Sequence, residues 1–353
     1  MGMLLNSPNQ KEGIHSKANE SGTKLITVNR ICELDCIKGI GILLVMFQHC
    51  MSASGCVDYA LSALILSFHM PLFFFASGFT YKKRNTIDYL AKRTASLLAP
   101  VLLYSIFNVI IFLVLYLINK DDYANQLYFA GFWFLISLLY ISIMYYVIDN
   151  FLDSRKNINI SKHAIHILVS IILLVIGLGY ARIIKGKENN IAIALVGYSF
   201  YSFGVLYGHH ILNFSKKHLS ALFRLVLLVI GMIGFCGLWF SCKKNTNILM
   251  YRNDFGNGVW FVINAVIGIS ALCCIVFGLK QNVFLEFFGR NSLVILLTHF
   301  PIYKVCVWGS GKVFNSPELK FIIGFIITCI IEVLRVEIIN RFAPFLDGRI
   351  RVR

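Results

Sequence analysis

Two ionisable side chains, Lys38 and His49, lie eleven residues apart in the first long apolar stretch of the chain. At about 100° per residue, this spacing places both on one face of a helix, separated by roughly 16 Å along its axis. Ionisable groups at membrane depth are costly and usually face a cavity or a partner. An imidazole can remove a proton from an alcohol, so the pair favours a catalytic face. The alternative is that Lys38 extends to the interface and His49 only bonds a neighbouring helix.

Two more histidines are expected at a similar depth. His69 falls about ten residues into the second apolar stretch, and His299 falls about nine residues into the ninth. At about 1.5 Å per residue, all three histidines reach the middle of a ~30 Å hydrocarbon layer. A single buried histidine more often completes a core hydrogen bond than performs catalysis. Three at one depth predict a polar chamber shared by the first, second and ninth helices.

Other charged residues and histidines give weaker functional signals. The densest basic cluster suits either phosphates or anionic lipid headgroups, and it consists of Lys82, Lys83, Arg84, Lys92 and Arg93. Glu332 and Arg335 have the i,i+3 spacing of a structural ion pair. His163 and His166, near the start of the fifth apolar stretch, are expected to be solvated.

The apolar stretches themselves predict a membrane protein. Hydrophobic residues make up 58% of the 353 residues and charged residues 14%, with a mean hydropathy of +0.72. Soluble domains are typically about 45–50% apolar and about 25% charged. The stretches are continuous, which favours helices over an outer-membrane barrel. We predict an all-α, polytopic fold with about ten spanning helices, near 37–55, 59–81, 95–118, 129–149, 163–180, 190–208, 221–240, 257–279, 291–309 and 320–339.

The distribution of basic residues predicts the orientation. With the N-terminus inside, the inner segments hold 21 Lys and Arg residues and the outer loops hold 9, so the positive-inside rule places both termini in the cytoplasm. Residues 1–29 are polar and lack the apolar core of a signal peptide. We interpret 1–29 as a disordered cytoplasmic tail, 30–345 as the ten-helix transmembrane domain and 346–353 as a short basic cytoplasmic tail.

Composition also argues against some partners. The net charge of +16 does not indicate nucleic-acid binding, because Lys and Arg occur in short runs between apolar stretches and form no single basic face. The ten Cys lack the Cys–His spacing of a zinc site, so we expect no metal. Membrane lipids are the expected surroundings. The sequence leaves open whether copies of the chain form a homo-oligomer.

From about residue 30 to residue 350, the chain carries a series of short motifs. The first runs from Leu34-Asp35 through Lys38-Gly39 to His49, with ten residues between the basic residue and the histidine. The later motifs are Phe68 to Phe79, Trp133 to Leu135, Phe288 to Ser292 followed by His299 and Pro301, and Pro344 to Gly348. In this order they resemble the acyltransferase-3 family of multispanning membrane O-acyltransferases, in the branch without a fused periplasmic domain. One departure is that the family's paired arginines before Leu-x-Pro are replaced here by Lys92-Arg93 before Pro100.

This resemblance implies an acyl-CoA-dependent O-acyltransferase of the cell (inner, cytoplasmic) membrane. The co-substrate would be cytoplasmic acyl-CoA, most often acetyl-CoA, and the acceptor a hydroxyl of a cell-envelope carbohydrate, as in polysaccharide O-acetylation. His49 would be catalytic, either as a general base or as a covalent acyl acceptor. Donor-binding residues would be Lys38, Lys92, Arg93 and Arg84, with support from Asp35, His69 and His299. Gly39 and Gly41 would let the pantetheine arm run along the first helix.

Two other classes of protein compete with this interpretation. A transporter or flippase of a glycan or lipid would also carry buried histidines and basic groups near the membrane midplane. Such folds usually contain paired, broken helices in two matching halves, and this sequence has only six prolines and no convincing internal repeat. A non-catalytic membrane scaffold or sensor would not need Lys38 and His49 on one face.

Overall fold

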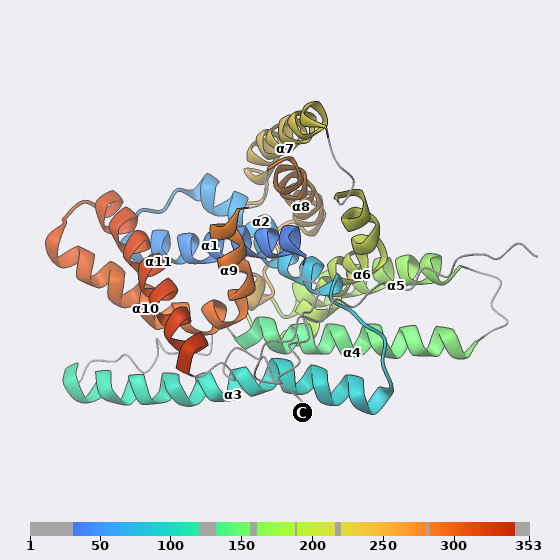
Figure 1. Ribbon diagram of the computed structural model, residues 1–353, viewed down its shortest axis with the longest axis horizontal. Coiled ribbons are helices and arrows are strands. Elements are labelled where there is room, and N and C mark those ends of the chain that lie inside the picture. Colours follow the sequence, from blue (N-terminus) through green and yellow to red (C-terminus); the bar gives the residue numbers. More distant parts are fainter. Residues whose placement is uncertain are drawn as a thin grey trace, which may run out of the picture. The chain divides into compact units, whose positions relative to one another are not determined.

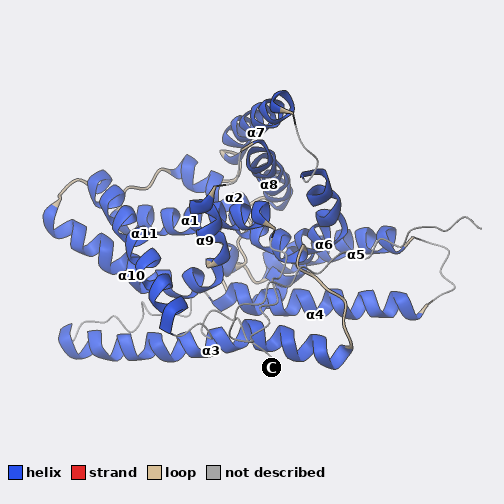
Figure 2. Cartoon of the chain, in the orientation of Figure 1, coloured by secondary structure: helices blue, strands red, loops and turns tan. Residues whose placement is uncertain are grey.

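A computed structural model of the 353-residue chain describes residues 31–119, 132–155, 161–187, 189–215, 220–279 and 282–342. Within these ranges the regular structure is helical, apart from one isolated β-bridge between Leu249 and Asp254 (Figure 2). The predicted all-α fold is therefore confirmed. The two predicted tails, 1–29 and 346–353, lie outside the described residues.

The described helices follow one another along the chain as labelled in Figure 1. They are α1 (Cys32–Ser54), α2 (Tyr59–Gly78), α3 (Thr86–Asn119), α4 (Phe132–Ser154), α5 (Lys162–Ile183), α6 (Asn190–Ser215), α7 (Ala221–Cys242), the 3₁₀ turn η2 (Met250–Arg252), α8 (Gly258–Gly278), α9 (Val283–Arg290), α10 (Ser292–Val313) and α11 (Pro317–Phe342). By length and composition, eight helices among the described residues could cross a membrane: α1, α2, α4 to α8 and α10. A multi-pass membrane protein is thus supported. The other two predicted spans coincide with α3 and α11, so the number ten stays a prediction.

Two helices differ from the expected pattern. α3 begins at Thr86, well before the predicted start near 95, so Lys92 and Arg93 lie in its first turns and not in a loop. Residues Val283–Arg290 form a separate short helix, α9, where the sequence predicted a loop. Asn282 caps this helix by accepting a hydrogen bond from the backbone N–H of Leu285 at 3.1 Å. An eight-residue helix is too short to appear in a search for stretches of about 20 apolar residues.

α2 and α10 share a local feature that bears on the site. Pro71 lies inside α2 and Pro301 inside α10, each two residues after a histidine. A proline inside a helix removes the hydrogen bond to the carbonyl four residues earlier. Membrane helices tolerate this loss where neighbouring groups compensate. Both histidines therefore lie next to a local interruption of the backbone ladder.

Glycines bring α1 and α9 into close backbone contact. A Cβ added to Gly39 of α1 would overlap the backbone carbonyl of Leu285, and one added to Gly289 of α9 would overlap the carbonyl of Asp35. Small residues at such positions let membrane helices approach closely. The contact fixes the rotation and the depth of the first turns of α1.

Further along, α1 contacts three other helices. Gly41 faces Phe73 of α2, and the Phe47 ring lies 4.8 Å edge-on from Phe321 of α11. α10 and α11 pack against each other, as do α7 with α8 and α5 with α6, while α2 contacts α6, α7 and α8 (Figure 1). α1 thus contacts α2 at Gly41, α11 at Phe47 and α10 at Cys50, which packs against Tyr303.

We expect Gly289→Ala to lower the melting temperature of the purified protein, because the added methyl group would force α9 away from the Asp35 carbonyl. Overpacking of this kind typically costs about 1–3 kcal/mol. Thermal unfolding in detergent, followed by tryptophan fluorescence, measures the effect. Gly237→Ala in α7 is the matched control, since nothing lies within 4 Å of its added Cβ. Equal melting temperatures for the two variants would contradict the close contact.

Candidate active site

His49 lies where α1 meets α10. Its ring centroid is 5.3 Å from that of His299, and 5.3 Å from that of Tyr303, to which it is nearly parallel at 12°. The Phe300 ring stands edge-on at 6.0 Å. His69 of α2 is near enough to interact electrostatically with His49. The histidines of the first, second and ninth predicted spans therefore gather at one place, as their common depth predicted.

Backbone carbonyls fix the other two histidines. Nδ1 of His69 lies 2.8 Å from the carbonyl oxygen of Ile65, and Nδ1 of His299 lies 3.0 Å from that of Ile295. Because a carbonyl oxygen only accepts, each Nδ1 must carry the hydrogen, and each Nε2 then keeps its lone pair. The Nε2 atom of His299 is buried and has no hydrogen-bond partner among the described residues. It is therefore available to accept a hydrogen bond from a group bound beside it.

A pocket of about 630 Å³ reaches the half-buried His49 ring. Its walls come from the last turns of α1, from α10 and from the start of α11, and consist of His49, Ser52, Ala53, Ser54, Tyr303, Lys304, Val307, Trp308, Gly311, Lys312 and Lys320. With the orientation predicted from the charge distribution, this end of the three helices would lie on the outer side of the membrane. A hydroxyl-bearing molecule in the pocket could thus contact the imidazole.

Lys38 lies toward the other end of α1, in a charged cluster with α9. Its Nζ is 3.9 Å from Asp35 Oδ1, and Asp35 Oδ2 is 3.7 Å from Arg290 Nε. Arg290 also pairs with the buried Glu286. Asp35 therefore contacts Lys38 with the i,i+3 geometry expected from the sequence. Lys38 does not line the pocket at His49, so a passage joining the two stays a prediction.

The expected path for the pantetheine arm past Gly39 and Gly41 is wrong. The space beside Gly39 is filled by the backbone of α9, and that beside Gly41 by the side chains of Leu72 and Phe73. Neighbouring helices, α9 and α2, therefore occupy the space that was expected for the ligand. An acyl donor would have to reach His49 along another face of α1.

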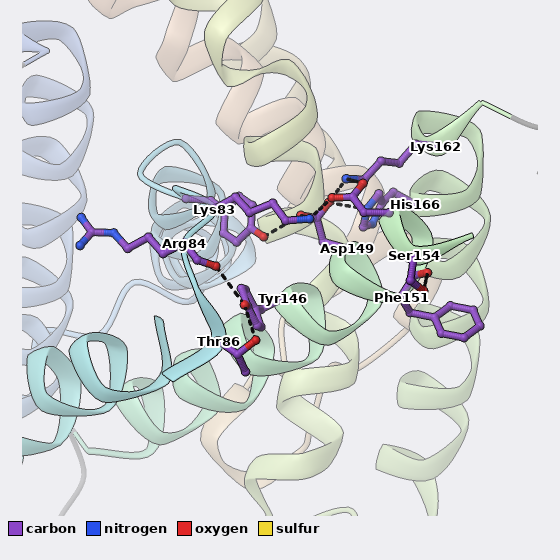
Figure 3. A network of polar contacts seen from close by, with 11 residues as sticks. Lys83, Arg84, Thr86, Tyr146, Asp149, Phe151, Ser154, Lys162 and His166 are labelled. Atoms are coloured by element: carbon purple, nitrogen blue, oxygen red, sulfur yellow. Dashed lines mark hydrogen bonds and ion pairs between the residues drawn. The ribbon is translucent and has the colours of Figure 1, made fainter. Parts of the chain in front are cut away.

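The other expected donor-binding residues lie in different surroundings. Lys92 is exposed, with its Nζ 3.8 Å from Asp88. Arg93, its neighbour, turns inward, and its Nε and Nη2 atoms are buried without a hydrogen-bond partner among the described residues. The Arg84 side chain extends away from the polar network in Figure 3, although its backbone carbonyl accepts a hydrogen bond from Tyr146 at 3.0 Å. Within this group, Arg93 is thus the residue whose buried guanidinium N–H groups donate to no described residue.

Figure 3 shows a second polar centre, built around Asp149 of α4. The carboxylate accepts hydrogen bonds from the Tyr81 hydroxyl at 2.8 Å and from Lys162 Nζ at 2.6 Å, and Lys83 Nζ lies 3.6 Å away. Burial, followed by the hydrogen bond to Asp149, raises the pKa of Tyr81, which therefore donates as a neutral phenol. The network joins the segment after α2 to α4 and α5. It also engages Lys83, the member of the basic cluster nearest to this carboxylate.

The expectation that His166 is solvated is wrong. Its side chain is 1% exposed, with Nε2 3.4 Å from an oxygen of Asp149. Its ring stacks on Tyr145 at 4.5 Å, and Nδ1 lies 3.5 Å from the Tyr198 hydroxyl. His163 is exposed, as expected. α5 turns the face that carries His166 toward α4 and α6. The position of a histidine at the start of an apolar stretch does not by itself indicate which face of the helix is buried.

Two features near His49 were not predicted from the sequence: the position of Tyr303 and the contact of Glu332 with Thr298. Glu332 forms the expected ion pair with Arg335 in α11, and it also lies 3.5 Å from the Thr298 hydroxyl, next to His299. Tyr303 is four residues after His299 on α10, so the two side chains share a helix face. That spacing was the available signal for Tyr303. The approach of α11 to Thr298 is a tertiary contact without a sequence signal.

We expect Asp149→Asn to destabilise the protein strongly, because it leaves Lys162 and Lys83 without the buried carboxylate that they share. Losing a hydrogen bond to a charged group typically costs about 1.5–3 kcal/mol. The measurement is the thermal unfolding midpoint of the purified variant. Asp153→Asn is the matched control, since its 44%-exposed carboxylate contacts the same two lysines. An equal loss of stability in the two variants would contradict a special role for the buried group.

Among the described residues, no group of three or more His, Cys, Asp or Glu side chains is placed to hold a metal ion. No curated protein and no solved structure matches the chain. A protein-family model, that of the acyltransferase-3 acyltransferase domain, matches residues 32–334. The match extends from α1 into α11 and includes the three histidines and the pocket. The chain therefore belongs to the acyltransferase-3 family of membrane-bound acyltransferases.

Proposed function

We propose that the protein transfers an acyl group, most often acetyl, from cytoplasmic acyl-CoA to a hydroxyl of a cell-envelope carbohydrate, within the cytoplasmic membrane. The observation that carries this proposal is the position of His49, whose half-buried ring faces a pocket of about 630 Å³ and packs against His299. A general base needs both access to the acceptor hydroxyl and a second polar group at the reacting centre. His49 and His299 meet these two requirements together.

The direct reaction is an exchange at the thioester carbonyl. The acceptor oxygen forms a bond to the carbonyl carbon while His49 takes the hydroxyl proton. The carbon–sulfur bond then breaks, and the leaving thiolate takes the proton from the imidazolium, so that the products are an ester and the CoA thiol. Such a base contributes roughly 10²–10⁴-fold to the rate. His299 supports the step by accepting a hydrogen bond from a bound reactant at Nε2. This atom is buried and has no hydrogen-bond partner among the described residues.

A covalent route uses the same residue differently. His49 would attack the thioester itself, release the CoA thiol and then pass the acyl group from its ring nitrogen to the acceptor. The two routes differ in kinetics, because only the covalent route releases CoA before the acceptor binds. Ping-pong kinetics would assign the covalent route.

The donor requires cations on the cytoplasmic side. Lys38 is held by Asp35 near that end of α1, and the buried guanidinium nitrogens of Arg93 have unused donors. Guanidinium and ammonium groups bind phosphate oxygens through charge-assisted hydrogen bonds. We therefore assign Lys38 and Arg93 to the phosphates of CoA, with Arg84 at the exposed edge and Lys92, which pairs with Asp88, in a lesser role.

We expect His49→Ala in isolated membranes to reduce acyl transfer from radiolabelled acetyl-CoA by about 10²–10⁴-fold, because it removes the proton acceptor. His163→Ala, which changes an exposed histidine of α5, is the matched control and should retain full transfer. Protein amount and melting temperature are measured for both variants. Transfer by His49→Ala within about threefold of wild type would remove this residue from any catalytic role.

We expect Lys38→Ala to raise the acyl-CoA concentration needed for half-maximal thermal stabilisation more than Lys38→Arg does, since arginine retains the charge that faces the phosphates. The purified protein is titrated with acetyl-CoA while its melting temperature is recorded. Equal effects of the two substitutions would indicate that Lys38 only extends to the membrane interface. A complete lack of stabilisation in the wild-type protein would favour a transporter of glycans or lipids.

A further inference from the structure

Among the described residues, the charged side chains that line the pocket at His49 are all cationic. They are Lys304 and Lys312 of α10 and Lys320 of α11, and none of the described lining residues is Asp or Glu. The nearest acidic residue in sequence is Glu318, which is exposed and lies outside the pocket wall. A concave site with charges of one sign concentrates ions of the opposite sign. The pocket therefore favours an anion.

Two of the pocket lysines lie on α10 and the third lies on α11. Lys304 is one residue after Tyr303, which stacks on His49, and its Nζ lies 4.6 Å from the centre of the Phe300 ring. Lys312 follows eight residues later on α10, roughly 12 Å further along the helix axis. The Lys320 stem lies against Gly311, where an added Cβ would be 3.6 Å from its Cε. Two helices of the pocket wall therefore present positive charge.

The remaining wall offers surfaces for a sugar. Trp308 lies between Lys304 and Lys312 in the sequence and is 61% exposed, with Lys312 Nζ 4.9 Å from its ring centre. Ser52 contributes a hydroxyl from α1. Aromatic faces provide flat apolar contact area, and hydroxyls both donate and accept hydrogen bonds. Together they suit the C–H face and the hydroxyl groups of a carbohydrate ring.

We propose that the acceptor is an anionic carbohydrate, carrying a carboxylate or phosphate group near the hydroxyl that is acylated, and that Lys312 and Lys320 select it. This inference rests on the proposed function, because it assigns the acceptor class of the same site. The lysines hold the anionic groups in charge-assisted contacts while the hydroxyl approaches His49. Acceptor binding should therefore weaken as salt is added.

The test measures binding without acyl-CoA, so that it does not depend on catalysis. The full chain in phosphatidylcholine nanodiscs is titrated with trigalacturonate and with its neutral methyl ester, at low and at high salt. The wild-type protein should bind the trianion at least about tenfold more tightly than the ester. The double variant Lys312→Gln, Lys320→Gln should lose about tenfold or more of that affinity.

The matched control is the double variant Lys243→Gln, Lys244→Gln. These lysines also lie over tryptophan rings, at 5.2 Å from Trp239 and 4.5 Å from Trp260, but outside the pocket wall. The control should bind trigalacturonate as tightly as wild type. Equal binding of the trianion and the ester, no binding of the trianion by wild type, or an equal loss in the control would each overturn the inference.

A lipid headgroup could supply the same negative charge, and a second set of nanodiscs separates the two sources. If phosphatidylglycerol in the disc abolishes trigalacturonate binding, the lysines form a lipid site and the acceptor assignment is overturned. If trigalacturonate still binds with the lysine dependence described, the assignment is supported. Loss of acyl transfer in other assays leaves this binding result unaffected, so failure of the proposed function and failure of the inference can be told apart.

Discussion

A polar side chain at membrane depth must find its partners inside the protein, and the contact of His49 with His299 and Tyr303 meets this constraint. The glycine contact between α1 and α9 sets the rotation of α1. The edge-on rings of Phe47 and Phe321 then hold the later turns of α1 against α11. Because both contacts lie before His49 along α1, a shift in either would turn the imidazole away from α10 and from the pocket.

The charged residues near the two ends of α1 are arranged differently. Near its start, cations occur beside carboxylates, as in the pairing of Lys38 with Asp35 and of Arg290 with Glu286. Near its end, the described residues of the pocket wall include lysines and no acidic residue. Charges of opposite sign attract each other across a helix contact, whereas a concave site lined by charges of one sign concentrates ions of the opposite sign. His49 lies on α1 between the Lys38 cluster and the last turn, which contributes Ser52, Ala53 and Ser54 to the pocket wall.

Sequence patterns predicted the contacts that depend on one helix. The spacing of Lys38 and His49, the pairing of Asp35 with Lys38, and the pairing of Glu332 with Arg335 all follow from 3.6 residues per turn. The gathering of three histidines required only a common depth. Contacts between helices were not predictable in this way. His166 is buried because α5 faces α4, and the space at Gly39 belongs to α9, a helix that composition did not reveal.

The most direct measurement is a cryo-electron microscopy structure of the protein in nanodiscs with a non-hydrolysable acetyl-CoA analogue. The central claim is that His49 is the group that meets the acyl carbonyl. We expect the carbonyl to lie within hydrogen-bonding reach of the imidazole, roughly 2.6–3.2 Å directly or one bridging water away, with the diphosphate on the side of Lys38 and Arg93. An analogue bound with its acyl group remote from His49, or with its phosphates in the lysine-lined pocket, would contradict the claim.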